Sequence, residues 1–113
     1  MCTQSQLQKI LRQIHQAAVA EFDGLLDAVI LYGSYARGDY DEESDIDIMV
    51  RVRMPKEQLI LYRRRFSHLA SDLGLEHNIL ISIHLQDYET FDQYRRHLPF
   101  YRNVDAEGVL VGV

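Results

Sequence analysis

The spacing of apolar residues predicts a helix near the start of the chain. Apolar side chains recur every three or four residues from Leu7 to Phe22, which is the period of an amphipathic helix. Ser5 and Gln8 have the spacing of a capping box, in which two side chains satisfy free backbone N–H groups at a helix start. We therefore expect this helix over about residues 6–22.

A short, uninterrupted apolar run follows at residues 28–32 (AVILY), and it has the length and composition of a buried strand. Gly33 ends this run. Ser34 is a favourable N-cap for one short turn of helix before Gly38. The next residues, 39–44 (DYDEES), are typical of an exposed loop.

The pattern then changes to strict alternation over residues 45–52. Asp45, Asp47 and Met49 occupy alternate positions, and the positions between them are isoleucines. Side chains of a strand point in turn to its two faces. This segment is therefore predicted to be a strand with one buried apolar face and two aspartates on the other.

A helix and a third strand are predicted next. Pro55 suits the first position of a helix whose apolar residues recur at helical spacing, and Gly74 is the expected stop. Residues 78–85 (NILISIHL) alternate again, with Ser82 and His84 on the face opposite to the odd-numbered isoleucines. The segment is therefore predicted to be a strand.

The rest of the chain predicts a short helix around residues 89–97, ending at Pro99, and an edge strand in the closing GVLVGV. The predicted order is helix, strand, short helix, strand, helix, strand, helix. This order indicates an α+β fold in which helices cover a small mixed sheet. A chain of 113 residues is expected to form a single domain over residues 1–113.

The composition and charge of the chain exclude several classes of protein. The chain is 47% hydrophobic and 26% charged, which is typical of a globular protein and not of a disordered one. Its net charge of -5 argues against general binding of nucleic acid, because phosphates favour a basic surface. The sequence has no apolar run of membrane-spanning length and no secretory signal pattern, and Cys2 is its single cysteine. We therefore expect a cytoplasmic protein with no membrane partner.

Residues Leu31 to Val50 (LYGSYARGDYDEESDIDIMV) carry the candidate chemistry. Two interpretations fail on particular positions. A phosphate-binding P-loop needs Lys and then Ser or Thr after Gly38, where this chain has Asp39 and Tyr40. A calcium loop beginning at Asp39 would lack both its turn glycine and its final glutamate, and a strand pattern follows it instead of a helix.

An exposed acidic loop explains residues 39–43, but it does not explain Asp47, which lies inside the strand pattern. Side chains two residues apart on a strand emerge on one face about 6–7 Å apart, so Asp45 and Asp47 could share a cation. Carboxylate oxygens are ligands that Mg²⁺ prefers. The Gly33–Ser34 turn offers backbone N–H groups to a phosphate. These residues together favour a two-metal site for phosphoryl transfer.

The spacing of these four residues resembles a known signature. Gly33–Ser34, ten further residues and then Asp45–Ile46–Asp47 match the G-S-x₁₀-D-x-D pattern of the DNA polymerase β-like nucleotidyltransferases. The segments GSYARG, SDIDIMV and FYRNVDAEGVLV resemble in particular the minimal nucleotidyltransferases, the MntA-like group. The resemblance covers most of the chain and implies the nucleotidyltransferase fold.

The resemblance also implies roles for these residues. Gly33 and Ser34 would bind the β- and γ-phosphates of a nucleoside triphosphate, and the catalytic residues Asp45 and Asp47 would hold Mg²⁺. The implied reaction is attack of an acceptor hydroxyl on the α-phosphate, which transfers NMP, with ATP as the expected donor, and releases pyrophosphate.

Three neighbouring side chains could assist at this site. Arg37 is expected to pair with an acid such as Asp39 or Asp41, and contact with phosphate is the alternative. Tyr35 and Tyr40 are candidate contacts to the nucleotide.

One residue of the family pattern has no counterpart here. The family adds a third carboxylate from a later strand, and strand parity places Ser82 at that position, with His84 as the next residue on the same face. Serine supplies no anionic oxygen at neutral pH, so metal binding is expected to be weaker. His84 is expected to be a hydrogen-bonded strand histidine.

Two functions remain open. The first is a Mg²⁺-dependent nucleotidyltransferase acting on a hydroxyl of a partner protein, because one small domain leaves no second lobe to bind an acceptor. The second is a catalytically weakened binding module, such as the antitoxin of the HEPN–MNT toxin–antitoxin pairs that the resemblance implies. Self-association, base preference and the identity of the acceptor are not determined by the sequence.

Overall fold

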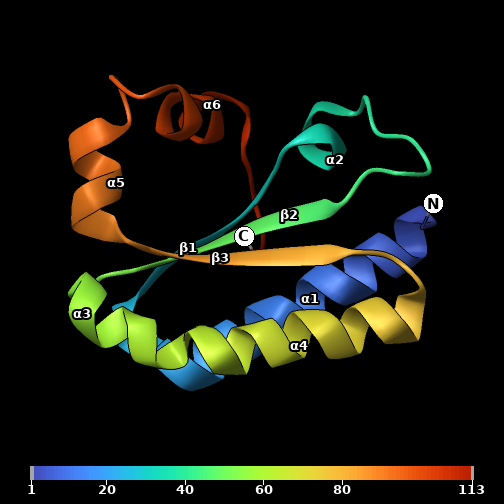
Figure 1. Cartoon of the computed structure of the whole chain (residues 1–113), viewed down its shortest axis with the longest axis horizontal. Helices are drawn as coiled ribbons and strands as arrows, with labels where there is room; N and C mark the ends of the chain where they lie inside the picture. The colour runs from blue at the N-terminus through green and yellow to red at the C-terminus, as the bar shows by residue number, and fades with distance from the viewer. Residues whose placement is uncertain (1, 113) are drawn as a thin grey trace.

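A computed structural model describes residues 2–112, and in these residues four strands form one mixed sheet (Figure 1). The spatial order of the strands is β3-β2-β1-β4. The central pair β1·β2 and the pair β1·β4 are antiparallel, whereas β2 and β3 run parallel. The strands are β1 (Leu26–Tyr32), β2 (Ile46–Val52), β3 (Ile81–Asp87) and β4 (Val109–Leu110).

Helices cover both faces of this sheet, as an α+β fold requires. Figure 1 shows α1 and α4 together on one face, and α2, α5 and α6 on the other. The α-helices are α1 (Gln4–Phe22), α2 (Ser34–Arg37), α3 (Lys56–Leu59), α4 (Arg63–His77), α5 (Tyr88–Tyr94) and α6 (Pro99–Glu107).

The strand β2 has the buried face that its alternation predicted. Ile46, Ile48, Val50 and Val52 are fully buried in the main core, against α1 and α4. Met49, on the opposite face, is also fully buried, in a smaller cluster formed with α5, α6 and β1. The face that carries Asp47 is therefore covered at its middle by helices and is accessible at its end.

The start of α1 differs from the prediction. Thr3, and not Ser5, is the N-cap, and it forms the capping box with Gln6 instead of Gln8. The Thr3 hydroxyl accepts from the Gln6 N–H at 3.1 Å, and the Thr3 N–H donates to the Gln6 side chain at 2.9 Å. The same sequence spacing occurs twice in this segment, and the earlier copy adds helical hydrogen bonds.

The helix predicted from Pro55 to Gly74 is divided and continues further. It consists of α3, a turn of 3₁₀ helix (Ile60–Tyr62) and α4, and it ends at His77, followed by the C-cap residue Asn78, whose φ of 53° is left-handed. Gly74 was wrongly predicted as the stop. A Cβ at Gly74 would lie 2.8 Å from the Ile79 carbonyl oxygen, so glycine is needed there for close packing against the chain that enters β3.

The C-terminal part contains a helix that the sequence pattern missed. The predicted segment 89–97 is α5, ending at Tyr94, and Pro99 begins α6 instead of ending a helix. The expected edge strand is confirmed as β4, which pairs with β1. Because β4 and α6 return to β1, the end of the chain packs beside the Gly33 turn.

Candidate active site

The Gly33 turn places its backbone directly against the carboxylate of Asp47. Tyr32 and Asp47 are register partners of the antiparallel β1·β2 pair, so Gly33 follows beside Asp47. Gly33 has φ 74° and ψ -155°, a conformation that essentially only glycine adopts. A Cβ at Gly33 would lie 2.6 Å from Asp47 Oδ2. The site therefore needs glycine for two reasons, its backbone conformation and its close contact with an acid.

The short helix α2 begins at this turn, but its cap differs from the prediction. Gly33 is the N-cap residue, and Ser34 is the first helical residue and makes no capping hydrogen bond. The Gly33 carbonyl accepts from the N–H groups of Ala36 and Arg37, both at 3.1 Å. The Ser34 hydroxyl is therefore not used as a cap and remains available to a ligand at the turn.

The predicted acids occupy different positions relative to β2. Asp47 lies within the strand and is half-buried, whereas Asp45 precedes the strand and is exposed. Burial raises the pKa of the Asp47 carboxyl above its usual 3.8, and the negative charge of Asp45 raises it further. The guanidinium of Arg37 acts in the opposite direction. A cation beside these acids would relieve the unfavourable interaction between their charges.

Tyr32 responds to the same charge. Burial, and after it the negative charge of Asp47, raise the pKa of the Tyr32 phenol to about 12. Tyr32 therefore stays protonated throughout the physiological range and can only donate or accept a hydrogen bond near the site.

Arg37 pairs with acids as predicted, and one of its partners is distant in sequence. Its Nε lies 3.2 Å from Asp39 Oδ2, and its Nη1 lies 3.4 Å from Glu107 Oε2 in α6. Asp41 does not pair with Arg37, because its carboxylate accepts from the Glu43 N–H and the Ser44 hydroxyl within the acidic loop. Arg37 therefore links the α2 turn to α6.

The two tyrosines near the motif pack on one another. Their rings are stacked with centroids 4.2 Å apart, and Tyr35 is buried with its hydroxyl beside the thiol of Cys2. Tyr35 therefore belongs to the core and not to a nucleotide-binding surface. Tyr40 covers it from the acidic loop.

The third strand places Ser82 beside Asp47, as strand parity predicted. Ser82 is the register partner of Asp47 in the parallel β2·β3 pair, and His84 is the partner of Met49. The His84 ring nitrogen lies 2.9 Å from the Gln86 side-chain oxygen, so the expected strand hydrogen bond is present. Within residues 2–112 no three His, Cys, Asp or Glu side chains gather as a metal-binding group.

A cleft beside the Gly33 turn includes residues of the missed helix α6. It has a volume of about 170 Å³ and lies between the end of β1, Arg37 and α6. The α6 residues that line it are Phe100, Asn103, Val104 and Glu107. A signal was present in the sequence, since Pro99 is favourable in the first turn of a helix and Phe100, Val104 and Glu107 follow at helical spacing.

The chemistry of these donors suits one hard cation bound together with phosphate. Two carboxylates at the start of β2 supply oxygen ligands, and the Asp47 carboxylate lies against a glycine turn whose backbone N–H groups are donors of the kind that phosphate binds. The described residues supply two acids to this place and not three.

Comparisons with known proteins identify the family. The nucleotidyltransferase domain model matches residues 6–105. A protein of Methanocaldococcus jannaschii with the name "Putative protein adenylyltransferase" is 33% identical over 101 residues, which are 89% of this chain and 93% of that protein. A second protein of that organism, with the same description, is 50% identical over 58 residues, and this match spans 56% of its length. The chain belongs to the nucleotidyltransferase domain family.

Solved structures agree with the fold. A crystal structure from Sulfolobus solfataricus, titled a "putative nucleotidyltransferase", has a TM-score of 0.58 and 25% identity, over 94% of this chain and 81% of that one. A toxin–antitoxin structure with AMP-PNP has a TM-score of 0.50 and 22% identity over 88% of this chain, and it shows the fold alone. In residues 2–112, no helix combines the length and apolar character that crossing a membrane requires.

Proposed function

We propose that this chain transfers AMP from ATP to a hydroxyl group of a partner protein. Gly33 and Ser34 bind the β- and γ-phosphates, and Asp45 and Asp47 hold Mg²⁺. The observation that carries this proposal is the contact between the glycine turn and the acid, where a Cβ on Gly33 would lie 2.6 Å from Asp47 Oδ2. A triphosphate on the turn would bring its oxygens to the same cation as the acids.

The reaction breaks the phosphoanhydride bond between the α- and β-phosphates of ATP and forms a phosphoester bond between the α-phosphate and the acceptor oxygen. The acceptor oxygen attacks the α-phosphorus, and the bond from that phosphorus to the α,β-bridging oxygen breaks. Pyrophosphate leaves with the electron pair, and the hydroxyl proton passes to water or to a nearby carboxylate. Mg²⁺, when bound, supplies neutralisation of the charge on the phosphate oxygens. The turn and the two acids position the phosphates for this attack.

A protein acceptor is supported by the size of the site and by the curated relatives. The cleft beside Gly33 holds about 170 Å³, which is small for a nucleotide and a second substrate together. The two relatives from M. jannaschii carry the name "Putative protein adenylyltransferase". We infer that a surface of the acceptor protein completes the site.

A second candidate function is a binding module with weak or no transfer, such as the antitoxin of a HEPN–MNT pair. It is favoured by one observation, that Ser82 stands beside Asp47 where the family has a third carboxylate. Without that acid a second cation has fewer ligands, and activation of the acceptor hydroxyl is weaker. In this case the protein would still bind nucleotide and partner.

Incubation with ATP labelled at the α-phosphate, Mg²⁺ and the product of the neighbouring gene tests the two candidates. The enzyme transfers label to the partner protein, and Asp47→Ala abolishes this transfer. Asp72→Ala is the matched control, because it removes an exposed acid of α4, on the sheet face opposite to the α2 turn, and should leave transfer unchanged. A stable complex without label transfer would support the binding module instead.

A further inference from the structure

The even-numbered residues of β3 place three polar side chains in a row on the sheet face of the candidate site. Ser82 is the register partner of Asp47, and side chains two residues apart on a strand share a face. The row is therefore Ser82, His84 and Gln86, and Asp87 follows it at the end of the strand. A hydroxyl, a base and a group that orients the base are the parts of an activated nucleophile.

Hydrogen bonds connect the buried end of this row. The Gln86 side-chain amide donates to the Asp87 backbone carbonyl at 3.2 Å and to Asp87 Oδ1 at 3.3 Å. Asp87 Oδ2 accepts from the Thr90 N–H at 2.9 Å, which holds the carboxylate at the start of α5. Gln86 and Asp87 are both buried. Two acceptors thus set the orientation of the Gln86 amide, and its oxygen is directed to the other side.

This orientation determines the tautomer of His84. His84 Nε2 lies 2.9 Å from Gln86 Oε1, which can only accept, so Nε2 carries the proton. In the neutral ring Nδ1 then has a lone pair and no proton. The two ring nitrogens lie on nearly opposite sides of an imidazole. Nδ1 therefore points away from Gln86 and back along β3 toward Ser82, where it is oriented to accept a proton.

An aromatic contact ties His84 to the candidate site. The ring of Phe100 in α6 packs edge-to-face against His84 and against Tyr32, with centroids 5.7 Å apart in each pair. Tyr32 is the register partner of Asp47 on the other side of β2. Phe100 therefore spans the sheet face from β1 to β3 and holds the His84 ring beside the acids.

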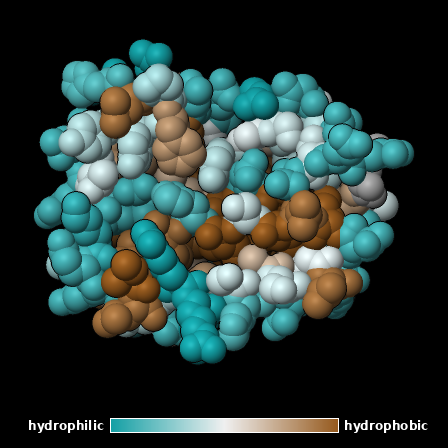
Figure 2. Space-filling view, viewed as in Figure 1, coloured by the Kyte–Doolittle hydropathy of each residue, from teal (hydrophilic) through white to brown (hydrophobic). Residues whose placement is uncertain are grey.

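Ser82 is accessible to a nucleotide. Its side chain is exposed, and β3 lies at the front edge of the sheet in Figure 1, between the two helical layers. In the same view, Figure 2 shows a mainly hydrophobic band in this place, with hydrophilic surface above and below it. No helix separates the strand from an incoming ligand there.

We propose that Ser82 is itself an acceptor, so that the chain adenylylates its own Ser82 hydroxyl with His84 as the base. This inference rests on the proposed function, because ATP must first bind at the turn and the acids. Ser82 Oγ attacks the α-phosphorus and forms a phosphoester bond. The bond from that phosphorus to the α,β-bridging oxygen breaks, and pyrophosphate leaves with the electron pair. The Oγ proton passes to His84 Nδ1, directly or through one water.

The position of Ser82 supports this role. Neighbouring strands lie about 4.8 Å apart, so the Ser82 side chain begins next to that of Asp47. The proposed function puts the triphosphate against the Gly33 turn and the same acid. A hydroxyl that is already fixed beside the phosphate does not have to be captured from solution, which favours its reaction. The serine that replaces a third acid thus supplies an acceptor.

Labelling in the absence of any partner protein tests the proposal. Incubation of the chain with Mg²⁺ and ATP labelled at the α-phosphate should place one AMP per chain on Ser82, located by peptide mass spectrometry. Ser82→Ala should abolish the label, whereas Ser82→Thr keeps a hydroxyl and should retain it. Because the acceptor and the bound ATP belong to one chain, the rate per chain should not change with protein concentration.

His84→Ala tests the base. Loss of the proton acceptor should slow labelling about 100-fold. His84 lines a hollow of about 240 Å³, so added imidazole has room to enter the space that alanine leaves and should restore part of the rate. Imidazole should restore nothing in Ser82→Ala. Slow labelling of His84→Ala that imidazole does not change would overturn the role of His84 as the base.

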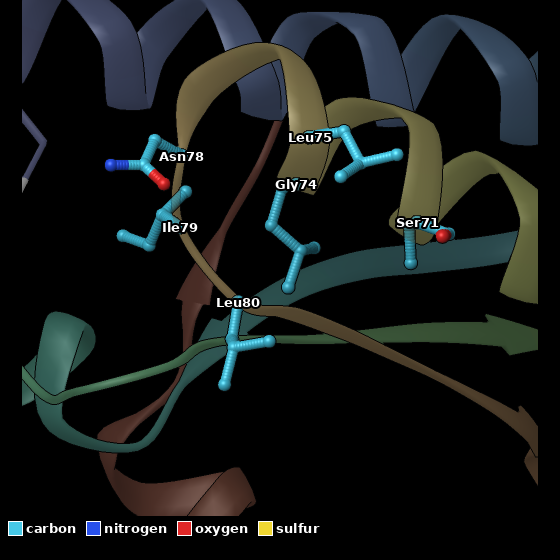
Figure 3. Close-up of a pocket in the computed structure, with 8 residues that line it drawn as sticks. Ser71, Gly74, Leu75, Asn78, Ile79 and Leu80 are labelled. Atoms are coloured by element: carbon cyan, nitrogen blue, oxygen red, sulfur yellow. The ribbon is translucent and has the colours of Figure 1, made fainter.

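Ser71→Ala is the matched control for Ser82→Ala. Figure 3 shows Ser71 on α4, beside a separate hollow of about 360 Å³, and α4 covers the sheet face opposite to the α2 turn. Ser71 is exposed, as Ser82 is, so its replacement should leave labelling unchanged. Circular dichroism checks that every variant is folded.

Calorimetry with ATP separates a failure of this inference from a failure of the proposed function. It is measured on Ser82→Ala, which does not consume ATP by labelling itself. ATP that binds while the wild type stays unlabelled, or label on a residue other than Ser82, would overturn self-adenylylation. Label that passes to a partner protein and never to this chain would also overturn it and would support the proposed function. A chain that binds no ATP would overturn both.

Discussion

The contact between Gly33 and Asp47 defines the candidate site at the scale of single residues. The turn needs a residue that tolerates φ 74° and has no side chain, because Asp47 Oδ2 occupies the space of a Cβ. The acid in turn is half-buried and feels the charge of Asp45. Both residues are unfavourable for stability in a protein without ligand, which is typical of sites that bind a charged ligand.

Gly33→Ala tests whether the Gly33 turn binds nucleotide, apart from its contribution to the stability of the fold. The alanine Cβ would collide with Asp47 and would force a conformation that L residues avoid, so we expect a loss of about 1–3 kcal/mol in the free energy of unfolding. ATP affinity should fall strongly, as measured by calorimetry.

Gly38→Ala is the matched control for this change. Gly38 has φ 86°, but a Cβ there meets nothing within 4 Å. It should lose stability and keep most of its nucleotide affinity. Equal ATP affinity in the two variants would show that the Gly33 turn does not bind phosphate.

Asp47→Asn should raise thermal stability at neutral pH in EDTA and without nucleotide. Because burial and Asp45 raise the pKa of Asp47 above 3.8, its ionised form destabilises the fold at neutral pH. Protonation of Asp47 stabilises the native state fully below pH 3.8, and this stabilisation is lost as the pH rises through the raised pKa. The difference in melting temperature between Asp47→Asn and the wild type should therefore shrink as the pH is lowered toward 3.8.

Melting curves at several pH values measure this difference. Asp45→Asn, at an exposed position, should give a smaller gain. A lower melting temperature for Asp47→Asn at pH 7 would contradict the role of its buried charge.

At the scale of elements, the register of β2 and β3 decides which side chains share the site. A parallel register that pairs Asp47 with Ser82 places a hydroxyl where a third acid would act. The alternation of NILISIHL fixed the face of Ser82, although the strand itself is shifted to Ile81–Asp87. The parity survived because alternation assigns each residue to a face whatever the exact ends of the strand.

Ser82→Asp should restore the missing ligand. The added carboxylate would stand beside Asp47, so Mg²⁺ affinity should rise about tenfold and label transfer should increase if the partner protein is an acceptor. Titration with Mg²⁺ or Mn²⁺ measures the first effect. Ser82→Asn has nearly the same size and no charge, and it should leave metal affinity near that of the wild type. Equal affinities for the two variants would place Ser82 outside the metal site.

At the scale of the whole molecule, the end of the chain completes the surroundings of the motif. The helix α6 lines the cleft beside Gly33, and Glu107 pairs with Arg37 across 70 residues of sequence. β4 pairs with β1 and holds α6 in this place. On the opposite side of the sheet, β3 forms the other edge within the described residues.

Local sequence patterns were sufficient to predict the type of the central helices and strands, but they were insufficient to predict where these elements begin and end. The alternation around Asp47 and the apolar spacing of α1 each reflect burial of one face, so they predicted type and orientation correctly. The helix ends were wrong where two candidate caps competed, as at Thr3 and Ser5, and where a glycine served close packing, as at Gly74. A one-dimensional pattern does not say which of two caps gains more hydrogen bonds, or what lies against a glycine.

The sequence by itself determined that a glycine–serine turn follows one buried strand and that two acids lie at the start of the next, with a family spacing, because hydrophobic alternation and backbone conformation are local properties. Only the tertiary structure decided that Asp47 touches Gly33, that Ser82 stands beside it, and that α6 covers the turn. Those facts depend on strand register and on contacts between residues far apart in the chain, which are set by how whole elements pack and not by any single segment.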